Sequence, residues 1–325
     1  MLLTDKTAVV YGAGGSIGGA VARAFAAEGA RVHLVGRTRE TLEAVASDIK
    51  DAEVAVVDAL DETAVEEHLA RVGDIDVSFN LVSRGDVQGV PITDMPVDDF
   101  LRPVLNGTRA NFITARAAAR RMAERGSGVV LTLNSGSAHG SPMMGGTGPA
   151  DAATDSLVRN LAMELGSRGV RAVGLWAAGI PETLTVEKLG KVNPDLNEAA
   201  IQGILDHLSS LRMTRRNPTL AEITATAVFL ASDHAAGITG TFVIVTGGMF
   251  PGCGDDEGRP VHAPGALRRR RTDYEAAASA VWALSARSTP ERDSETRRRR
   301  AALGSAVVSQ VSVRSRVSWE TWIDG

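Results

Sequence analysis

Cysteine, lysine and tyrosine are all scarce in this chain. Its 325 residues include one cysteine, four lysines and two tyrosines, and aromatic residues make up 4% of the sequence. The single cysteine, Cys253, excludes an internal disulfide and a metal site built from several thiolates. Because the histidines do not stand at metal-ligand spacing either, we expect no metal.

Long apolar runs are missing as well. No stretch approaches the ~18 apolar residues that a membrane-spanning helix needs. The first residues also lack the basic segment followed by an apolar segment that marks a secretory signal. We therefore expect a cytoplasmic protein that does not bind a membrane.

Charge divides the chain into two parts. Residues 251–325 contain 13 arginines, no lysine and 10 acidic residues, whereas residues 1–250 contain 22 basic and 29 acidic residues. The acidic first part argues against nucleic acid as the main partner. Runs of arginine at 268–271 and 297–300 predict an Arg-rich, disordered C-terminal extension over 251–325. A nucleic-acid or membrane arm and a non-native extension are the alternatives for this segment.

A strand, a glycine-rich turn and a helix open the sequence. Residues 7–11 form an uncharged apolar run, typical of a strand that is buried on both faces of a parallel sheet. The turn follows at 12–18, and helical spacing of apolar residues leads to a second strand at 31–36. A turn of small residues lets the backbone approach a pyrophosphate, and the N-terminus of the next helix favours its negative charge. This arrangement predicts a dinucleotide site.

Strands and helices continue to alternate over the first 250 residues. Further strands are predicted at 53–58, 76–82, 129–133, 172–177 and 241–246, and helices at 41–49, 63–72, 97–124, 150–166, 196–211 and 220–232. This alternation predicts an α/β fold, a Rossmann-type doubly wound parallel seven-stranded sheet in a single domain. The polar segment 183–194 has the composition of a flexible lid over a site.

With these strands, the glycine turn and the closing Thr246-Gly247-Gly248, residues 1–250 resemble the short-chain dehydrogenase/reductase family. That resemblance implies an NAD(P)-binding Rossmann domain. The family turn reads T-G-x-x-x-G-x-G, and here Ser16 replaces the middle glycine, which is acceptable if its backbone does not need a positive φ. The cofactor-binding residues implied by the resemblance are Gly12, Gly14, Gly15, Ser16, Ile17, Gly18, Arg37, Asp58, Ala59, Asn80 and Ile180.

The end of the second strand bears on which cofactor is bound. Members that prefer NAD place an acid there to hold the ribose 2′-hydroxyl, whereas this chain has Gly36 followed by Arg37 and, two positions on, Arg39. Without the acid nothing repels a 2′-phosphate, and a guanidinium can pair with it. We therefore expect NADP, with NAD as the alternative; two solvated surface arginines would be the simpler interpretation.

The resemblance also assigns the catalytic positions. Asn106 matches the asparagine that ordinarily holds a water for proton relay, and Ser135 matches the serine that polarises the substrate, with Asn134 as the alternative if the register is one residue off. The family's Tyr-x-x-x-Lys pair falls on Thr147 and Asp151. A threonine hydroxyl is far too weak an acid to replace a phenol, and an aspartate would raise a neighbour's pKa where the lysine lowers it.

No other part of the chain restores the missing pair. The two tyrosines are Tyr11 and Tyr274, and no lysine lies in the predicted helix 150–166. His139, in the loop after Ser135, has a suitable intrinsic pKa to supply the proton, although a solvent-exposed loop histidine is the simpler interpretation. Asp151 could act as an acid or base if buried; otherwise it is a surface carboxylate at the start of its helix.

Three functions follow from these expectations. The first is a divergent NADP-dependent oxidoreductase acting on a small hydrophobic carbonyl or alcohol, with Met143 and Met144 as possible lining of the substrate pocket. The second is an NADP(H)-binding pseudo-enzyme or partner subunit without redox turnover. The third is non-redox dehydratase, isomerase or cyclase chemistry with Asp151 as the base. Since relatives build dimer contacts from the helices at 97–124 and 150–166, we expect a homodimer or homotetramer.

Overall fold

Seven parallel strands form the centre of the molecule. The structure is a computed structural model that describes residues 1–186 and 197–249. The strands are β1 (Thr7–Tyr11), β2 (Arg31–Gly36), β3 (Glu53–Val56), β4 (Val77–Asn80), β5 (Gly128–Asn134), β6 (Val170–Trp176) and β7 (Thr241–Ile244). Their order is β3-β2-β1-β4-β5-β6-β7, and every pairing is parallel. The predicted doubly wound seven-stranded sheet is confirmed.

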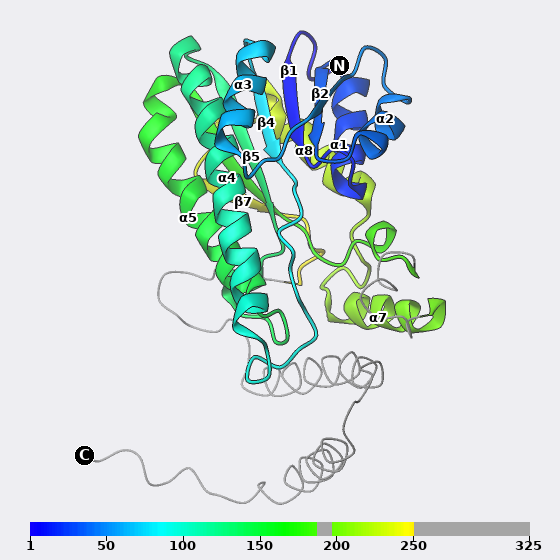
Figure 1. Ribbon diagram of the computed structural model, residues 1–325. Helices are drawn as coiled ribbons and strands as arrows, with labels where there is room; N and C mark the ends of the chain where they lie inside the picture. The colour runs from blue at the N-terminus through cyan, green and yellow to red at the C-terminus, as the bar shows by residue number, and fades with distance from the viewer. Residues whose placement is uncertain (187–196, 250–325) are drawn as a thin grey trace, which may run out of the picture.

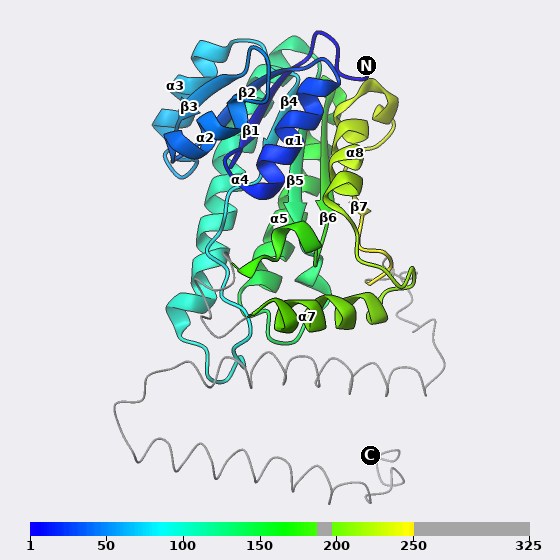
Figure 2. The ribbon, with the colours of Figure 1, turned by 90° about the vertical axis from the view of Figure 1, so that its right-hand side faces the viewer.

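Helices cover both faces of this sheet (Figure 1). They are α1 (Ser16–Ala27), α2 (Arg39–Ala46), α3 (Glu62–Val72), α4 (Val97–Arg125), α5 (Thr147–Leu165), α7 (Glu198–Leu211) and α8 (Leu220–Ala231). One buried cluster joins α1, α2 and α8 to the sheet, and a second joins α3 and α4 to the other face. Figure 2 shows α1 and α8 side by side over the first face.

Strand β1 shows why both faces need covering. Its side chains alternate, so that Ala8 and Val10 belong to the cluster with α1 and α8, while Val9 and Tyr11 belong to the cluster with α3 and α4. All four residues are fully buried. An apolar run without alternation of polarity is therefore what this central strand requires.

The predicted boundaries differ from the observed ones in a few places. Helix α2 begins two residues earlier and ends three residues earlier than predicted, at Arg39 and Ala46. The predicted helix 150–166 begins too late, because α5 already begins at Thr147, and the segment before it contains a 3-10 helix at Ser137–His139. Most of the predicted lid 183–194 and the whole predicted extension 251–325 lie outside the described residues.

The topology determines where a ligand can bind. The chain runs outward from β1 to β2 and β3 and then returns to β4 on the other side of β1. At such a switch point the loops after the two neighbouring strands diverge and leave a crevice at the carboxyl ends of the strands. Figure 2 shows α7 beyond this end of the sheet.

A buried arginine fixes the loops beyond β6 and β7 at the same end. Arg212 is 1% exposed, and its Nη2 donates to the carbonyl oxygen of Ala178 at 2.8 Å. Its Nη1 donates to the carbonyl oxygen of Thr246, and its Nε donates to Asn217 Oδ1 at 2.9 Å. One side chain thus ties together three loop segments that are far apart in the sequence.

Candidate active site

A cavity of about 460 Å³ lies at the carboxyl ends of β1 to β4. Its lining includes most of the residues that the resemblance implies for the cofactor: Gly12, Gly14, Gly15, Ser16, Ile17, Gly18, Arg37, Asp58 and Ala59. Leu81, Val82, Ser83 and Asn106 close it on the side of β4 and α4. The cavity therefore coincides with the crevice at the switch point.

The glycine turn is shaped by close approaches of the backbone. Gly12 has a φ of 76°, and a Cβ atom there would lie 2.5 Å from the carbonyl oxygen of Leu81. A Cβ atom on Gly18 would lie 2.2 Å from the carbonyl oxygen of Gly12. Ser16 is the first residue of α1 and is not among the described non-glycine residues with positive φ, so the condition for a serine at this position is met.

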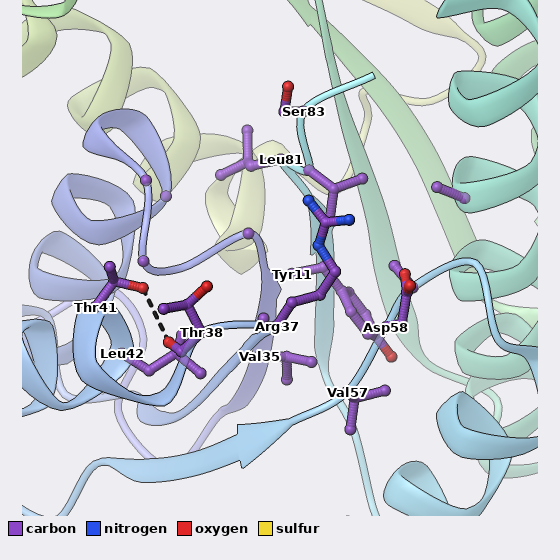
Figure 3. Close-up of a pocket in the computed structure, with 18 of the residues that line it drawn as sticks. Tyr11, Val35, Arg37, Thr38, Thr41, Leu42, Val57, Asp58, Leu81 and Ser83 are labelled. Atoms are coloured by element: carbon purple, nitrogen blue, oxygen red, sulfur yellow. Dashed lines mark hydrogen bonds between the residues drawn. The ribbon is translucent and has the colours of Figure 1, made fainter. Parts of the chain in front are cut away.

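Arg37 extends over the cavity between Thr38 and Asp58 (Figure 3). Within residues 1–186 and 197–249, no carboxylate pairs with it, whereas Arg39 lies 3.5 Å from Glu43. Asp58 accepts a hydrogen bond of 3.0 Å from the backbone N–H of Leu60. The two arginines after β2 therefore differ: Arg37 is available to a ligand in the cavity, and Arg39 interacts with its own helix.

These residues fit a nicotinamide dinucleotide. The glycine turn brings the backbone close to the cavity, and the N-terminus of α1, whose dipole favours negative charge, lies where a pyrophosphate would bind. Among the described residues that line the cavity, Asp58 has the only carboxylate, so this lining does not oppose the charge of a phosphate strongly.

A buried carboxylate organises the neighbouring site. Asp151 Oδ2 accepts hydrogen bonds from the Ser135 hydroxyl at 2.6 Å, from the Ser135 backbone N–H at 3.1 Å and from the Ser137 backbone N–H at 3.0 Å. The two serine Oγ atoms are 2.7 Å apart. Since an ionised carboxylate only accepts, the hydrogen of the Ser135 hydroxyl points to Asp151 and not to a substrate.

Arg84 neutralises the other oxygen of Asp151. Its Nη1 donates to Asp151 Oδ1 at 2.7 Å, and its Nη2 donates to Asp86 Oδ1 at 2.9 Å. Burial lowers the pKa of the guanidinium, but Asp86 and Asp151 together raise it by more, so the net pKa of Arg84 is raised. Arg84 therefore carries a positive charge at neutral pH.

The position of the family tyrosine belongs to the same network. Thr147, 1% exposed, donates its hydroxyl hydrogen to Asp86 Oδ1 at 2.8 Å and accepts a long hydrogen bond of 3.4 Å from Gln88. Its hydroxyl is thus used by a structural contact. The residue cannot serve as the acid that a tyrosine would be.

The interpretation of Asp151 as a surface carboxylate is wrong. The residue is 0% exposed, because it lies on the face of α5 that packs against the sheet together with Ala150, Thr154 and Val158. The proposed role of Asp151 as a catalytic base is not supported either, since both oxygens accept hydrogen bonds and no part of the side chain reaches solvent.

A second buried carboxylate lies one helical turn further along α5. Asp155 Oδ1 accepts from Asn134 Nδ2 at 2.7 Å and from Trp176 Nε1 at 3.3 Å. Burial raises the pKa of Asp155, while these two hydrogen bonds lower it by less. Asn134, the alternative to Ser135, is 4% exposed and uses its amide nitrogen in this contact and in another to the backbone of Asp151.

A second cavity of about 210 Å³ adjoins the first. Leu81, Val82 and Ser83 line both, and the second is lined further by Ser135, Arg84, Asp86, Gly107, Asn111 and Asn134, among others. A substrate in the second cavity would therefore lie beside a nucleotide in the first.

Three of the expected residues lie elsewhere. His139 is exposed, its ring lies tilted beside that of Trp176 with 4.9 Å between the ring centroids, and it lines neither cavity. Ile180 is 3% exposed, packs into the hydrophobic core and lines neither cavity. Asn80 lines only the second cavity, where its Nδ2 donates to Asn111 Oδ1 at 2.9 Å.

Asn106 lies at the first cavity and not beside Ser135. Its Nδ2 donates to the backbone oxygen of Arg84 at 3.3 Å, and its side chain lines the larger cavity. The structure does not bring Asn106 and Ser135 into contact. A proton relay between them would need intervening water.

Arg84 and Asp86 are the functional candidates that sequence reasoning missed. Both lie in the segment after β4, more than sixty positions before Asp151. One signal pointed to them: two carboxylates at the spacing of Asp151 and Asp155 fall on the apolar face of the α5 pattern, and buried carboxylates require a cation or several donors. The sequence alone does not say which of the many arginines supplies it.

Neither a substitute phenol nor a metal cluster occurs in the described part of the chain. Tyr11 is fully buried in β1, where burial raises the pKa of its phenol; Tyr274 lies outside the described residues. No group of three or more His, Cys, Asp or Glu side chains among residues 1–186 and 197–249 could hold a metal ion. None of the described helices is long and apolar enough to cross a membrane.

Comparison with known proteins agrees with this geometry. Residues 12–250 match the family model described as enoyl-(acyl carrier protein) reductase. The chain is 30% identical to levodione reductase of Leifsonia aquatica, over 76% of this chain and 94% of that protein, and 33% identical to an L-rhamnose 1-dehydrogenase (NAD(P)+) of Azotobacter vinelandii, over 77% and 98%. A solved structure of a short chain dehydrogenase/reductase family protein superimposes with a TM-score of 0.64 at 31% identity and covers 76% of this chain and 98% of that one.

Proposed function

The chain belongs to the short-chain dehydrogenase/reductase family of NAD(P)-dependent oxidoreductases, which act on CH–OH and C=O groups. We propose that it is an NADP-dependent oxidoreductase that acts on a small hydrophobic carbonyl or alcohol. The observation that carries this proposal is the pair of adjoining cavities, one lined by the glycine turn and Arg37, the other by Ser135 and Arg84.

The preference for NADP rests on Arg37. Its guanidinium lines the cavity and has no carboxylate partner in the described part of the chain. Arg37 comes directly after the second strand, where we expect the 2′-phosphate of NADP to lie. A guanidinium pairs with phosphate through two parallel hydrogen bonds, and each such charged hydrogen bond contributes about 1.5–3 kcal/mol.

Calorimetric titration of the full chain with NADPH and NADH tests this preference. We expect tighter binding of NADPH, and we expect Arg37→Gln to weaken NADPH binding at least tenfold while it leaves NADH binding nearly unchanged. Arg39→Gln is the matched control, since that side chain interacts with Glu43. Equal losses for both cofactors in Arg37→Gln would contradict NADP selectivity.

The proposed hydrophobic character of the substrate rests on methionines in two loops that pack together, although none of these methionines lines either of the two cavities. The segments before α4 and before α5 pack together: the Gly89 N–H donates to the Met143 carbonyl oxygen at 2.7 Å, and Met95 lies against Gly145. Met95, Met143 and Met144 are all partly buried there. Unbranched sulfur side chains adapt to varied apolar ligands. A panel of aliphatic, aromatic and polyhydroxylated carbonyls, with NADPH oxidation as the readout, tests this substrate class.

A second function is favoured by one observation at the catalytic positions. The Ser135 hydroxyl donates to Asp151, and the Thr147 hydroxyl donates to Asp86. A site whose hydroxyl hydrogens are already used fits an NADP(H)-binding partner subunit without redox turnover. Tight NADPH binding together with inertness across the whole panel would support this function and retire the first.

We also propose that the chain forms a homodimer or homotetramer through α4 and α5. Large apolar side chains are exposed on these helices: Leu105 is 63% exposed, Phe112 is 46% exposed and Met163 is 83% exposed. Light scattering coupled to size exclusion tests the assembly, and Leu105→Glu with Met163→Glu should shift it toward the monomer.

A further inference from the structure

We propose that Arg84 is a catalytic residue whose guanidinium hydrogen-bonds the substrate oxygen and stabilises the negative charge that develops there during hydride transfer. This inference rests on the proposed oxidoreductase function. In the family the positive charge at the catalytic site comes from the lysine at the position of Asp151 in α5. Here we assign that charge to Arg84, in the loop after β4.

Arg84 is placed to contact a ligand in the second cavity. Its side chain is 14% exposed and lines the cavity together with Ser135 and the end of β4. A glycine makes room for it: a Cβ atom on Gly107 would lie 2.7 Å from Arg84 Cδ and 3.3 Å from Arg84 Cγ. Any larger residue at position 107 would displace the arginine from its contact with Asp151.

The guanidinium keeps donors for a substrate. Of its five N–H groups, the one on Nε and one on Nη2 point to Asp86, at 3.3 Å and 2.9 Å, and one on Nη1 points to Asp151. One N–H on Nη1 and one on Nη2 have no hydrogen-bond partner among residues 1–186 and 197–249 and remain for a ligand. They lie in the plane fixed by the two carboxylates, so the position of these donors is set before the substrate binds.

Ser135 cannot supply the same interaction. Its hydroxyl hydrogen is engaged in a 2.6 Å hydrogen bond to a carboxylate, which is about twice as strong as a neutral one. Redirecting that hydrogen to a ketone would leave a fully buried carboxylate oxygen with fewer donors. Ser135 therefore serves, with Ser137, to position Asp151 and through it Arg84.

The step balances with water as the proton source. The nicotinamide, when bound, supplies the hydride. The carbonyl carbon accepts the hydride, the two π electrons of the C=O bond move to oxygen, and the oxygen accepts hydrogen bonds from Arg84. A proton from water then completes the alcohol and leaves hydroxide. Arg84 stays protonated throughout, because a guanidinium does not lose its proton in a protein.

Replacement of Arg84 tests the role directly. We expect Arg84→Gln to lower kcat for carbonyl reduction by 10²- to 10³-fold, the usual cost of losing one oxyanion donor, with NADPH affinity unchanged. Arg102→Gln is the matched control, since Arg102 is exposed and pairs with Asp99. Thermal melting shows whether the variant is folded, and Gly107→Ala moves Arg84 without removing its charge. Gly203→Ala, where a Cβ atom meets nothing within 4 Å, is the control for that change.

Two readouts separate this role from a structural one. The rate of reduction in wild-type protein should stay flat between about pH 6 and 10, because arginine does not titrate there, whereas Arg84→Lys should lose rate as the lysine approaches its pKa of about 10.4. An unreactive secondary amide should bind the NADPH complex at least tenfold more weakly in Arg84→Gln, as measured by calorimetry.

The outcomes also separate this inference from the proposed function. Wild-type protein that binds NADPH but reduces no carbonyl overturns the proposed function, and the role of Arg84 with it. Turnover in Arg84→Gln within threefold of wild type, or unchanged amide binding, overturns the role of Arg84 alone. A fall in rate near neutral pH that persists in Arg84→Lys would show that a titrating side chain donates the proton, and would overturn water as the proton source.

Discussion

The two adjoining cavities differ in what forms them: backbone atoms in the larger one and side chains in the smaller one. The larger one is shaped by backbone atoms of the glycine turn and the N-terminus of α1. Carbonyl oxygens there lie so close to the glycines that a Cβ atom would not fit. The smaller one is shaped by side chains, with Asp151, Arg84 and Asp86 in one hydrogen-bonded network. A backbone site tolerates a change such as Ser16 without losing its form. A side-chain site can reverse its charges when two or three residues change, while the fold around it stays the same.

The largest expected effect is the loss of stability on removing Asp151. Asp151→Ala leaves Arg84 with one carboxylate fewer and three donors without an acceptor in a buried site. Breaking a buried ion pair costs about 3–5 kcal/mol, which for a domain of this size lowers Tm by roughly 10 °C. Calorimetric melting measures it, and Asp206→Ala on the exposed face of α7 is the control. A loss below ~1 kcal/mol would show that Asp151 does not hold the site together.

The second effect concerns the larger cavity. Gly18→Ala places a Cβ atom 2.2 Å from the carbonyl oxygen of Gly12, so the turn must open. Overpacking of this kind costs about 1–3 kcal/mol, and we expect a tenfold to hundredfold weaker NADPH complex by calorimetry. Gly166→Ala, where a Cβ atom meets nothing within 4 Å, should change nothing. Because the two cavities are built differently, we expect Gly18→Ala to leave the affinity for the unreactive secondary amide unchanged once NADPH is saturating. An equal loss of amide affinity would show that the two cavities are not independent.

The larger cavity could be read from the sequence because its determinants are local. The bounds of β1 and β2 match the prediction residue for residue, and the glycines between them follow from strand, turn and helix within thirty positions. Ile180 differs from these residues, because it lies in a loop after β6 and its side chain packs into the core and not into the cavity.

The smaller cavity could be predicted only in part. Ser135 follows directly from the end of β5, and it does line the cavity. The burial of its partner Asp151 stayed open, because the predicted helix began three residues too late and its buried face was not identified. The contact with Arg84 spans 67 positions and joins a loop to a helix, and no local pattern specifies such a pair.

A third prediction concerns how the stability of the protein depends on pH through two buried histidines in the half of the molecule that carries the larger cavity. His33 and His68 are each 4% exposed, with ring centroids 6.1 Å apart. Burial, the charge of His33 and Arg71 lower the pKa of His68 to about 4. Since the folded pKa lies below the unfolded value of about 6.5, the unfolded chain binds the proton first. Stability is therefore full above pH 6.5 and falls as the pH drops toward 4, by roughly 2 kcal/mol.

Urea unfolding at pH 7 and pH 4.5 measures this effect. His68→Leu should reduce the difference between the two pH values, and His234→Leu, an exposed histidine, should not. An undiminished difference in His68→Leu would assign the acid sensitivity to carboxylates such as Glu222, whose pKa is lowered to about 2 mainly by its hydrogen bonds with Arg216.

The smallest effect is expected at Thr147, where a substitution shows whether the residue donates a proton or only occupies the position of the family tyrosine. This residue occupies the place of the family tyrosine, but its hydroxyl hydrogen is directed to Asp86 at 2.8 Å. Thr147→Val keeps the shape and removes one hydrogen bond, so we expect a loss of about 1 kcal/mol in unfolding free energy. Carbonyl reduction should continue within about threefold, because Arg84 remains held by Asp151 and Asp86. If Thr147→Val instead abolished turnover and Arg84→Gln did not, the proton-donating role would still belong to the first turn of α5, and the charge reversal around Asp151 would be a matter of stability alone.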